Sequence, residues 1–106
     1  ASYQLPIVVL VMNNQVLGMV RQWQKLFYGN RFADTDPHRK TDFVKVAEAF
    51  GVKGMRISNN DEIDSVIKEA IDYNGPVVVD CLISPDSNVL PMIPPGGSAD
   101  DIITTF

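Results

Sequence analysis

Hydrophobic residues change their spacing within the first 28 positions, and this change predicts two consecutive elements. Ile7 to Met12 form a continuous apolar run, which is typical of a strand buried on both faces of a sheet. Pro6 suits the first position of such a strand, because its missing N–H is least needed there. From Met19 the apolar residues recur at helical spacing, so we expect a helix that ends at Gly29-Asn30.

A second helix and a second strand are predicted after a polar loop. The loop covers residues 30 to 41 and contains Pro37. Thr41 is a suitable N-cap for a helix that ends at Gly51. The apolar face of this helix carries Phe43, Val46, Ala47 and Phe50. Residues 52 to 57 then predict a short strand.

The clearest helical periodicity lies between Asn59 and Gly75. Asn59 and Glu62 approximate a capping box at its start. The apolar positions are Ile63, Val66, Ile67, Ala70 and Ile71. Pro76 precedes a further apolar strand, residues 77 to 83, and the proline- and glycine-rich residues after it exclude a long regular element.

Strands that alternate with amphipathic helices predict an α/β fold, with a parallel sheet flanked by helices and an irregular C-terminal tail. We expect one domain over residues 1–84 and a tail over residues 85–106. About three strands would leave an edge of the sheet open. Because the chain starts without an initiator Met and enters a strand almost at once, we expect it to be a piece of a longer polypeptide.

Composition narrows the classes of function. The chain has 106 residues, of which 45% are hydrophobic and 21% charged, as expected for a single globular domain. The net charge of −4 and the scattered Lys and Arg argue against nucleic-acid binding. No apolar run is long enough to span a membrane, and we find no signal peptide. Cys81 is the single cysteine, so we expect a buried thiol, no disulfide and a reducing compartment.

The turn after the first strand is the main candidate for chemistry. In parallel sheets, ligands bind beyond the carboxyl ends of the strands, where Asn13 and Asn14 lie. Amide oxygens suit Mg²⁺, the N-terminus of the next helix suits an anion, and Gly18 allows close backbone approach. The alternative is that the two asparagines only turn the chain and cap the helix.

Three stretches carry a resemblance to a known family. Residues 11 to 32 read Val-Met-Asn-Asn-Gln-Val-Leu-Gly-Met-Val-Arg-Gln-Trp-Gln-Lys-Leu-Phe-Tyr-Gly-Asn-Arg-Phe. Residues 42 to 54 read Asp-Phe-Val-Lys-Val-Ala-Glu-Ala-Phe-Gly-Val-Lys-Gly, and residues 89 to 97 read Val-Leu-Pro-Met-Ile-Pro-Pro-Gly-Gly. Together with Gly-Pro-Val at residues 75 to 77, they resemble the C-terminal thiamine-diphosphate-binding domain of the acetolactate synthase (acetohydroxyacid synthase) large catalytic subunit.

The resemblance implies a role for each residue of the turn. It implies Mg²⁺ ligands at the Asn14 side-chain oxygen and the Val16 carbonyl, and a substrate pocket at Trp23 and Met19. The cofactor contacts that it implies are Asn13, Asn14, Gln15, Gly18 and Met19. From the pattern alone, core packing is the favoured interpretation of Trp23, and the family resemblance reverses this preference. For Met19, core packing and a place in the pocket are balanced.

Part of the family's site is absent from the chain. The Gly-Asp-Gly that begins the family's thiamine-diphosphate motif, and supplies another Mg²⁺ ligand, does not occur here. The family's activating glutamate belongs to its N-terminal domain, and its FAD site lies largely in its middle domain. We therefore expect no catalytic residue in this chain, and weak or no binding of metal and cofactor by the chain alone.

The activity implied for the whole enzyme is the condensation of two pyruvates, or of pyruvate with 2-oxobutanoate. The products are 2-acetolactate and 2-aceto-2-hydroxybutanoate, formed with release of CO₂ in branched-chain amino acid biosynthesis. The family implies a homo-oligomer with a regulatory subunit, in the cytoplasm or, in a plant, an organellar stroma. Two alternatives stay open: another thiamine-diphosphate enzyme, such as a glyoxylate carboligase or a 2-oxoacid decarboxylase, and a non-enzymatic α/β binding module.

The remaining polar candidates are weaker. His38 lies in a polar loop and is expected to be solvated, and Asp34, Asp36 and Asp42 lack the spacing of a Ca²⁺ loop. The family resemblance implies that the tail is a lid, which becomes ordered over the active site when ligands bind. The proline and glycine content of the tail allows such a change.

Overall fold

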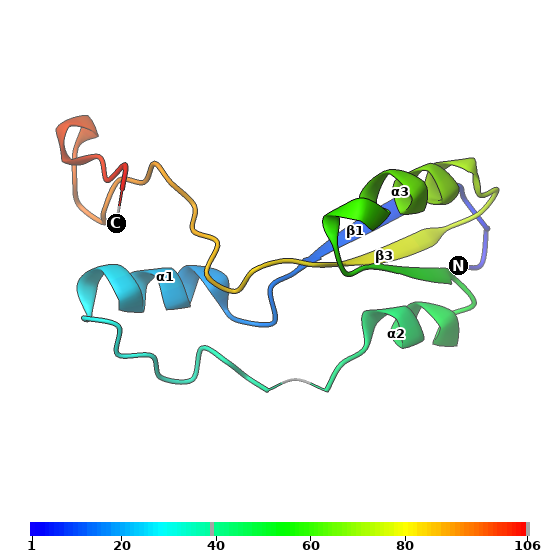
Figure 1. The fold of residues 1–106 in the computed structure, drawn as a ribbon, viewed down its shortest axis with the longest axis horizontal. Coiled ribbons are helices and arrows are strands. Elements are labelled where there is room, and N and C mark those ends of the chain that lie inside the picture. The colour runs from blue at the N-terminus through cyan, green and yellow to red at the C-terminus, as the bar shows by residue number, and fades with distance from the viewer. Residues whose placement is uncertain (39, 106) are drawn as a thin grey trace. The chain divides into compact units, whose positions relative to one another are not determined.

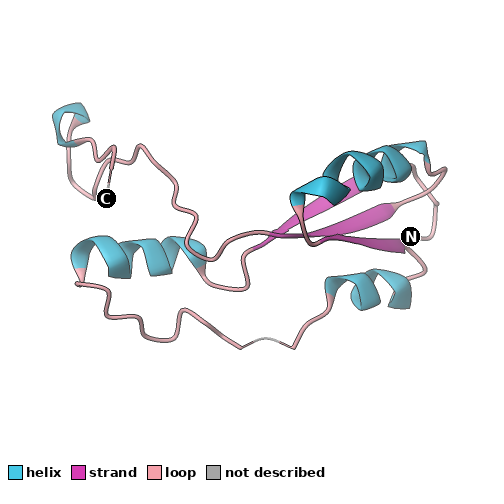
Figure 2. Cartoon of the chain, in the orientation of Figure 1, coloured by secondary structure: helices cyan, strands magenta, loops and turns pink. Residues whose placement is uncertain are grey.

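The computed structural model describes residues 1–38 and 40–105, and it confirms the predicted order of elements (Figure 1). Figure 2 shows short connections between the elements of residues 43–82 and a long stretch without helix or strand after residue 82. The strands are β1 (Val8–Asn13), β2 (Lys53–Ile57) and β3 (Val77–Leu82). The helices are α1 (Gly18–Phe27), α2 (Phe43–Ala49) and α3 (Ile63–Asp72), with 3-10 turns η1 (Asn60–Glu62) and η2 (Ala99–Asp101). No helix among the described residues has the length and apolar character required to cross a membrane.

The chain divides into two compact units, each described here by itself. Unit 1 comprises residues 1–14 and 38–84, and unit 2 comprises residues 15–37 and 85–106. The three strands, α2 and α3 belong to unit 1, whereas α1 and η2 belong to unit 2. The expected division of the chain into a domain over 1–84 and a tail over 85–106 stays a prediction.

Unit 1 is a parallel three-stranded sheet with the order β1-β3-β2. Figure 1 shows α2 and α3 on opposite sides of this sheet, so the predicted parallel α/β arrangement is confirmed. Side chains alternate between the two faces of a strand. The hydrophobic core lies on the α3 face and consists of Ile57, Ala70, Val77, Val79 and Cys81, with Val8, Met55, Val66 and Ile67 packed against it. The expectation of a buried Cys81 is therefore confirmed.

The prediction that the first strand is buried on both faces is wrong. Val9, Leu10 and Met12 each expose about half or more of their surface. The reason is that β1 is an edge strand, which pairs only with β3, while α2 and α3 pack on β2 and β3. An apolar run thus predicts a strand correctly, yet it does not by itself show which neighbours cover that strand.

Helix α2 begins one residue later than predicted. Its N-cap is Asp42 and not Thr41, because the Asp42 carboxylate accepts hydrogen bonds from the Val44 and Lys45 N–H groups. The helix lies close against β2 at Gly54. A Cβ atom at Gly54 would lie 2.8 Å from Val44 Cγ1 and 2.8 Å from the Val44 carbonyl oxygen. Only a glycine therefore fits at this point of β2.

The start of α3 differs slightly from the expected capping box. Asn59 caps η1 as expected, since its side chain accepts a hydrogen bond from the Asp61 N–H at 3.1 Å. The Glu62 carboxylate accepts a 2.7 Å hydrogen bond from the Ser58 N–H. This hydrogen bond holds the pKa of Glu62 below its ordinary value.

Unit 2 is held together mainly by polar side chains. Gln22 of α1 is 3% exposed, and its amide both donates to the Val89 carbonyl oxygen and accepts from the Val89 N–H. Gln24 makes the same pair of bonds with Ala33. Arg21 forms an ion pair with Asp86 at 2.9 Å. As predicted, residues 85–105 form no long element, and the structure gives them η2 and an isolated antiparallel bridge between Met92 and Ile103.

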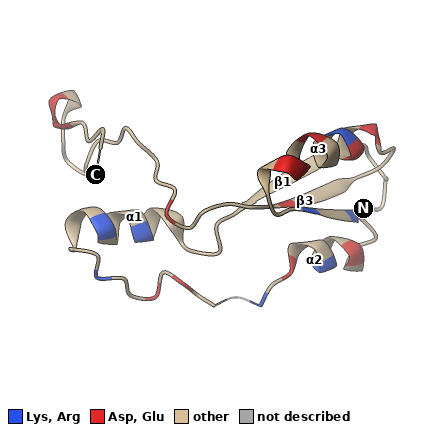
Figure 3. Ribbon diagram, viewed as in Figure 1, with Lys and Arg blue, Asp and Glu red and all other residues tan. Residues whose placement is uncertain are grey.

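Charged residues distribute differently over the helices (Figure 3). Helix α1 carries Arg21 and Lys25 and no acidic residue, whereas α3 carries both signs. In α3, Lys68 pairs with Asp72 one turn later at 3.3 Å. The outer side of α3 is therefore a mixed charged surface of the kind expected on a solvated helix.

Candidate functional site

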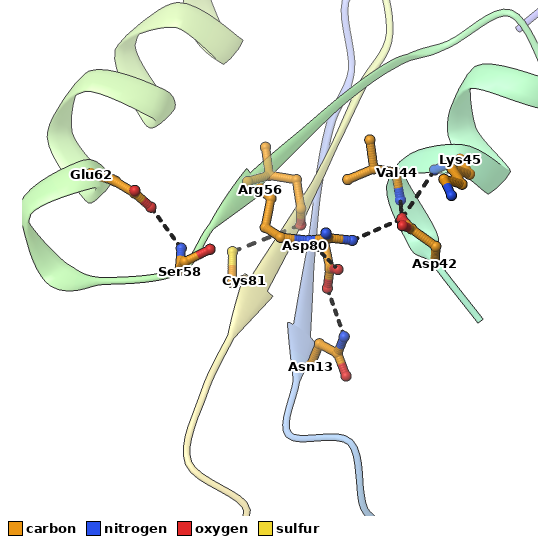
Figure 4. Close-up of polar contacts among 10 residues, drawn as sticks. Asn13, Asp42, Val44, Lys45, Arg56, Ser58, Glu62, Asp80 and Cys81 are labelled. Atoms are coloured by element: carbon orange, nitrogen blue, oxygen red, sulfur yellow. Dashed lines mark hydrogen bonds and ion pairs between the residues drawn. The ribbon is translucent and has the colours of Figure 1, made fainter. Parts of the chain in front are cut away.

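A buried carboxylate, Asp80 of β3, joins the ends of the strands in unit 1. Asp80 is 1% exposed and accepts hydrogen bonds through both oxygens. Oδ1 accepts from Asn13 Nδ2 at 2.9 Å, and Oδ2 accepts from Arg56 Nε at 3.1 Å (Figure 4). A buried charge is tolerated when it is paired and hydrogen-bonded, and Asp80 meets both conditions.

Sheet register brings these three residues together. Asp80 lies directly opposite Val11 of β1 and Arg56 of β2. Asn13 is two residues beyond Val11 and therefore points to the same face. This is the face covered by α2, as the contact between Gly54 and Val44 shows. The parallel register thus places a carboxylate of the central strand between polar side chains of both neighbours.

Arg56 continues the network to the N-terminus of α2. Arg56 Nη2 donates to Asp42 Oδ1 at 2.8 Å, and the same oxygen caps α2 (Figure 4). The hydrogen bond to Asp80 and the attraction of both carboxylates raise the pKa of Arg56 above its ordinary value. The hydrogen bond from the Lys45 N–H, helped by Arg56, lowers the pKa of Asp42. Asn13, Asp80, Arg56 and Asp42 form a continuous chain of charged and polar contacts, named here the Asp80 network.

The turn with the predicted ligands follows directly after β1. The Asn13 carbonyl oxygen accepts a hydrogen bond from the Ile83 N–H at 3.1 Å, so the main chain of Asn13 is still part of the sheet. Gln15 adopts a φ of 59°, in the left-handed region that turns require. Asn14 is the last residue of this segment in unit 1, and Gln15 and Val16 belong to unit 2.

The helix after the turn begins at the predicted glycine. Gly18 is the first residue of α1, and the Leu17 N–H donates to the Thr35 carbonyl oxygen at 2.8 Å. Met19 is 52% exposed and Trp23 is 37% exposed. The Trp23 ring meets Phe27 edge to face, with centroids 5.9 Å apart. Their assignment to a substrate pocket stays a prediction.

The donor types at the turn suit part of a Mg²⁺ site. The Asn14 amide in unit 1 offers a neutral, hard oxygen, which Mg²⁺ accepts alongside phosphate and water, and the Val16 carbonyl in unit 2 is a donor of the same type. The assignment of both as Mg²⁺ ligands stays a prediction. Within residues 1–38 and 40–105, no three His, Cys, Asp or Glu side chains gather as a metal site. The acidic loop residues therefore form no such group, and His38 is exposed as expected. The fit is to the neutral ligands of such a site only.

Asp80 and Arg56 are not among the residues that the sequence predicts for a site. A signal was present, because Asp80 is the one charged residue in the apolar run from Val77 to Ile83. A charge in a strand predicted to be buried requires a partner, and Arg56 in the short second strand was available. The register that makes them neighbours could not be read from the sequence.

Comparison with protein-family models gives one match, over residues 1–81. The matching family is described as "Thiamine pyrophosphate enzyme, C-terminal TPP binding domain". Thiamine pyrophosphate (TPP) is another name for thiamine diphosphate. This match includes the Asp80 network and all the predicted site residues of the turn.

Several curated relatives match nearly the whole chain, as two examples show. The acetolactate synthase large subunit of Pyropia yezoensis is 44% identical over 104 residues, covering 97% of this chain and 18% of the relative. The probable acetolactate synthase large subunit of Methanocaldococcus jannaschii is 45% identical over 103 residues, covering 97% of this chain and 17% of the relative. The chain thus spans less than a fifth of the length of these relatives.

Among solved structures, the fold matches a thiamine diphosphate-dependent 4-hydroxybenzoylformate decarboxylase of Rhodococcus jostii RHA1. The TM-score is 0.70 at 25% sequence identity, and the match covers 79% of this chain and 16% of that one. The α/β arrangement predicted from the sequence therefore occurs in an enzyme that uses the predicted cofactor.

Proposed function

The chain belongs to the C-terminal TPP-binding domain family of thiamine pyrophosphate enzymes, and we propose on this basis that it is part of an acetolactate synthase large subunit. The observation that carries the proposal is the identity of 44% and 45%, over 97% of the chain, to relatives with that name. The resemblance in the turn, the second helix and the tail agrees with it.

The proposed reaction joins pyruvate to a second 2-oxoacid, pyruvate or 2-oxobutanoate, with release of CO₂. Bound thiamine diphosphate supplies the electron sink for the decarboxylation. The residues of this chain bind and orient: the Asn14 side chain and the Val16 carbonyl would hold Mg²⁺, and Asn13, Gln15 and Gly18 would lie beside the diphosphate. Met19 and Trp23 would shape the substrate pocket.

Other parts of the enzyme would complete the site. A further Mg²⁺ ligand, the activating glutamate and the FAD site are assigned by the family resemblance to segments outside the matched region. We also propose a homo-oligomer with a regulatory subunit, in the cytoplasm or an organellar stroma, acting in branched-chain amino acid biosynthesis. The proposal predicts that residues 1–106 alone bind Mg²⁺ and cofactor weakly.

The test uses the full-length subunit that contains this segment. Wild-type enzyme should convert pyruvate to 2-acetolactate only with thiamine diphosphate and Mg²⁺. Asn14→Ala should raise the Mg²⁺ concentration for half-maximal activity by about ten-fold or more, because one of few protein ligands is lost. Asn74→Ala is the matched control, since Asn74 is exposed in the turn before β3, and it should behave like wild type.

A second candidate function follows from the structural match to a decarboxylase. A decarboxylase would release an aldehyde and CO₂ from a 2-oxoacid and form no 2-acetolactate. Product identification by chromatography after incubation with pyruvate separates the two functions. An enzyme that consumes no 2-oxoacid in the presence of thiamine diphosphate and Mg²⁺ would contradict both.

A further inference from the structure

We propose that Asp80 is a positioning residue for the cofactor site: through Asn13 it fixes the turn that carries the Mg²⁺ ligand Asn14. The identity of the ligand rests on the proposed function. The positioning rests on contacts within unit 1 alone, namely those of Asp80 with Asn13 and Arg56. Asp80 itself touches neither metal nor cofactor in this proposal.

Asp80 fixes the orientation of the Asn13 amide. A carboxylate can only accept hydrogen bonds, so the Asn13 group that meets Asp80 Oδ1 at 2.9 Å must be the NH₂. The Asn13 side-chain oxygen then points away from β3. In this way Asp80 determines which end of the Asn13 amide faces the turn.

Asn13 is held by both its main chain and its side chain. Its carbonyl oxygen accepts from the Ile83 N–H at 3.1 Å, and its side chain donates to Asp80. Asp80 belongs to β3, the central strand of the sheet, and Ile83 is the residue that follows it. Asn14, covalently next to Asn13, therefore leaves the sheet from a residue with fixed main chain and fixed side chain.

Asp80 is itself held in place by Arg56. Arg56 binds its second oxygen at 3.1 Å, and Asp42 holds Arg56 from the other side at 2.8 Å. Asp80 is buried whereas the Arg56 side chain is 39% exposed, so the carboxylate is the partner that loses its contact with water. A buried carboxylate is seldom the most stabilising choice for a core position, because an apolar residue of similar size often stabilises a fold as well or better. A buried carboxylate at this position is better explained by the orientation that it gives to Asn13.

The decisive variant is Asp80→Asn in the full-length enzyme. Asparagine has the same shape, but it offers one acceptor and one donor. Arg56, which can only donate, will take the oxygen, so the new NH₂ group faces Asn13. The Asn13 amide must then either lose this hydrogen bond or turn over to present its oxygen, and in both cases the orientation that Asp80 gives it is lost. We expect the dissociation constant for Mg²⁺ and thiamine diphosphate to rise about ten-fold, as for other residues that orient a metal ligand. The kcat at saturating cofactor should change little.

Val79→Ala is the control for stability, because Val79 is next to Asp80 in β3 but packs in the apolar core and takes no part in the Asp80 network. It should lower stability and leave the dissociation constant at the wild-type value. Equal effects of Asp80→Asn and Val79→Ala on this constant would reduce Asp80 to a structural role and overturn the proposal.

A double-mutant cycle with Asn13→Ala tests the route through Asn13. If Asp80 acts through Asn13, Asp80→Asn should have no further effect on the dissociation constant in the Asn13→Ala background. Additive effects would overturn the proposal, as would wild-type affinity in Asp80→Asn. Should Asp80→Asn fail to fold, Asn13→Ala removes the same hydrogen bond, and an unchanged constant there is equally decisive against it. Failure of wild-type enzyme to bind the cofactor would refute the proposed function instead, and titration by calorimetry shows this before any variant is made.

Discussion

The two units of the chain are held together by different means. In unit 1, the sheet packs α3 through an apolar core, and the residues of that core, from Ile57 to Cys81, all belong to this unit. Among the described residues of unit 2, the buried side chains are those of Gln22 and Thr35, which are polar. Hydrophobic burial thus organises one unit, and hydrogen bonds between side chains and main chain organise the other.

The two kinds of interaction respond differently to small structural shifts. Burial of apolar surface is non-directional and tolerates small shifts, whereas a buried amide loses its contribution as soon as its partner moves. The tail from Pro85 onward is held on α1 by the bonds of Gln22 to Val89 and Met92 and by the ion pair of Arg21 with Asp86. A segment held by a few polar contacts opens locally more readily than one held by an apolar core.

The largest effect is expected from opening the core of unit 1. Val79→Ala removes two methyl groups from a side chain that is 0% exposed, and should lower the free energy of unfolding by about 2 kcal/mol. Urea unfolding followed by far-UV circular dichroism measures this. Val9→Ala, on the exposed edge strand, is the control and should cost much less. Equal losses for both variants would contradict the claim that burial in the α3 face stabilises unit 1.

An intermediate effect is expected from releasing the tail in unit 2. Gln22→Leu removes both hydrogen bonds to Val89 while it keeps a similar volume, and each such bond contributes about 1 kcal/mol. Amide hydrogen exchange at Val89 should become faster by about ten-fold, while exchange in β3 stays unchanged. Gln24→Leu, which frees Ala33 and not Val89, is the matched control. Slower or unchanged exchange at Val89 in the Gln22 variant would show that Gln22 does not hold the tail at Val89.

The smallest effect is expected from the pH dependence of stability in unit 1. The pKa of Asp42 is lowered in the folded chain by the Lys45 N–H and by Arg56, so its carboxylate stabilises the fold above its ordinary pKa. This contribution is lost as the pH falls through the lowered value. Between pH 6 and pH 3, Asp42→Asn should therefore lose less stability than wild type, as measured by thermal unfolding at each pH. A steeper loss in the variant would reverse the sign of this argument.

Much of the fold could be predicted from the sequence, because it depends on local periodicity. The apolar run before Asn13 and the helical spacing between Ile63 and Ile71 gave the elements of unit 1 within a residue or two. The order of the strands, and with it the exposure of β1, depends on pairing between distant residues. Local pattern contains no such information, so a strand that is half exposed was predicted to be buried.

The site was predicted in part, and for a similar reason. The turn at Asn13 and Asn14 could be found because it interrupts an apolar strand, and the family resemblance gave its residues their proposed roles. Asp80 and Gln22 were missed, because each acts on a residue 67 positions away. A polar residue inside an apolar pattern shows that a partner must exist, but the sequence does not name that partner.

Gly54 determines how close α2 comes to the sheet. Since a single added carbon would lie 2.8 Å from Val44, the distance between the two layers is set by the smallest side chain. Asp42 reaches Arg56 from the start of that same helix, and Arg56 in turn holds Asp80. The small size of Gly54 therefore keeps α2 close enough to β2 for Asp42 to bind Arg56. In this way a glycine contributes to the Asp80 network without making a polar contact of its own.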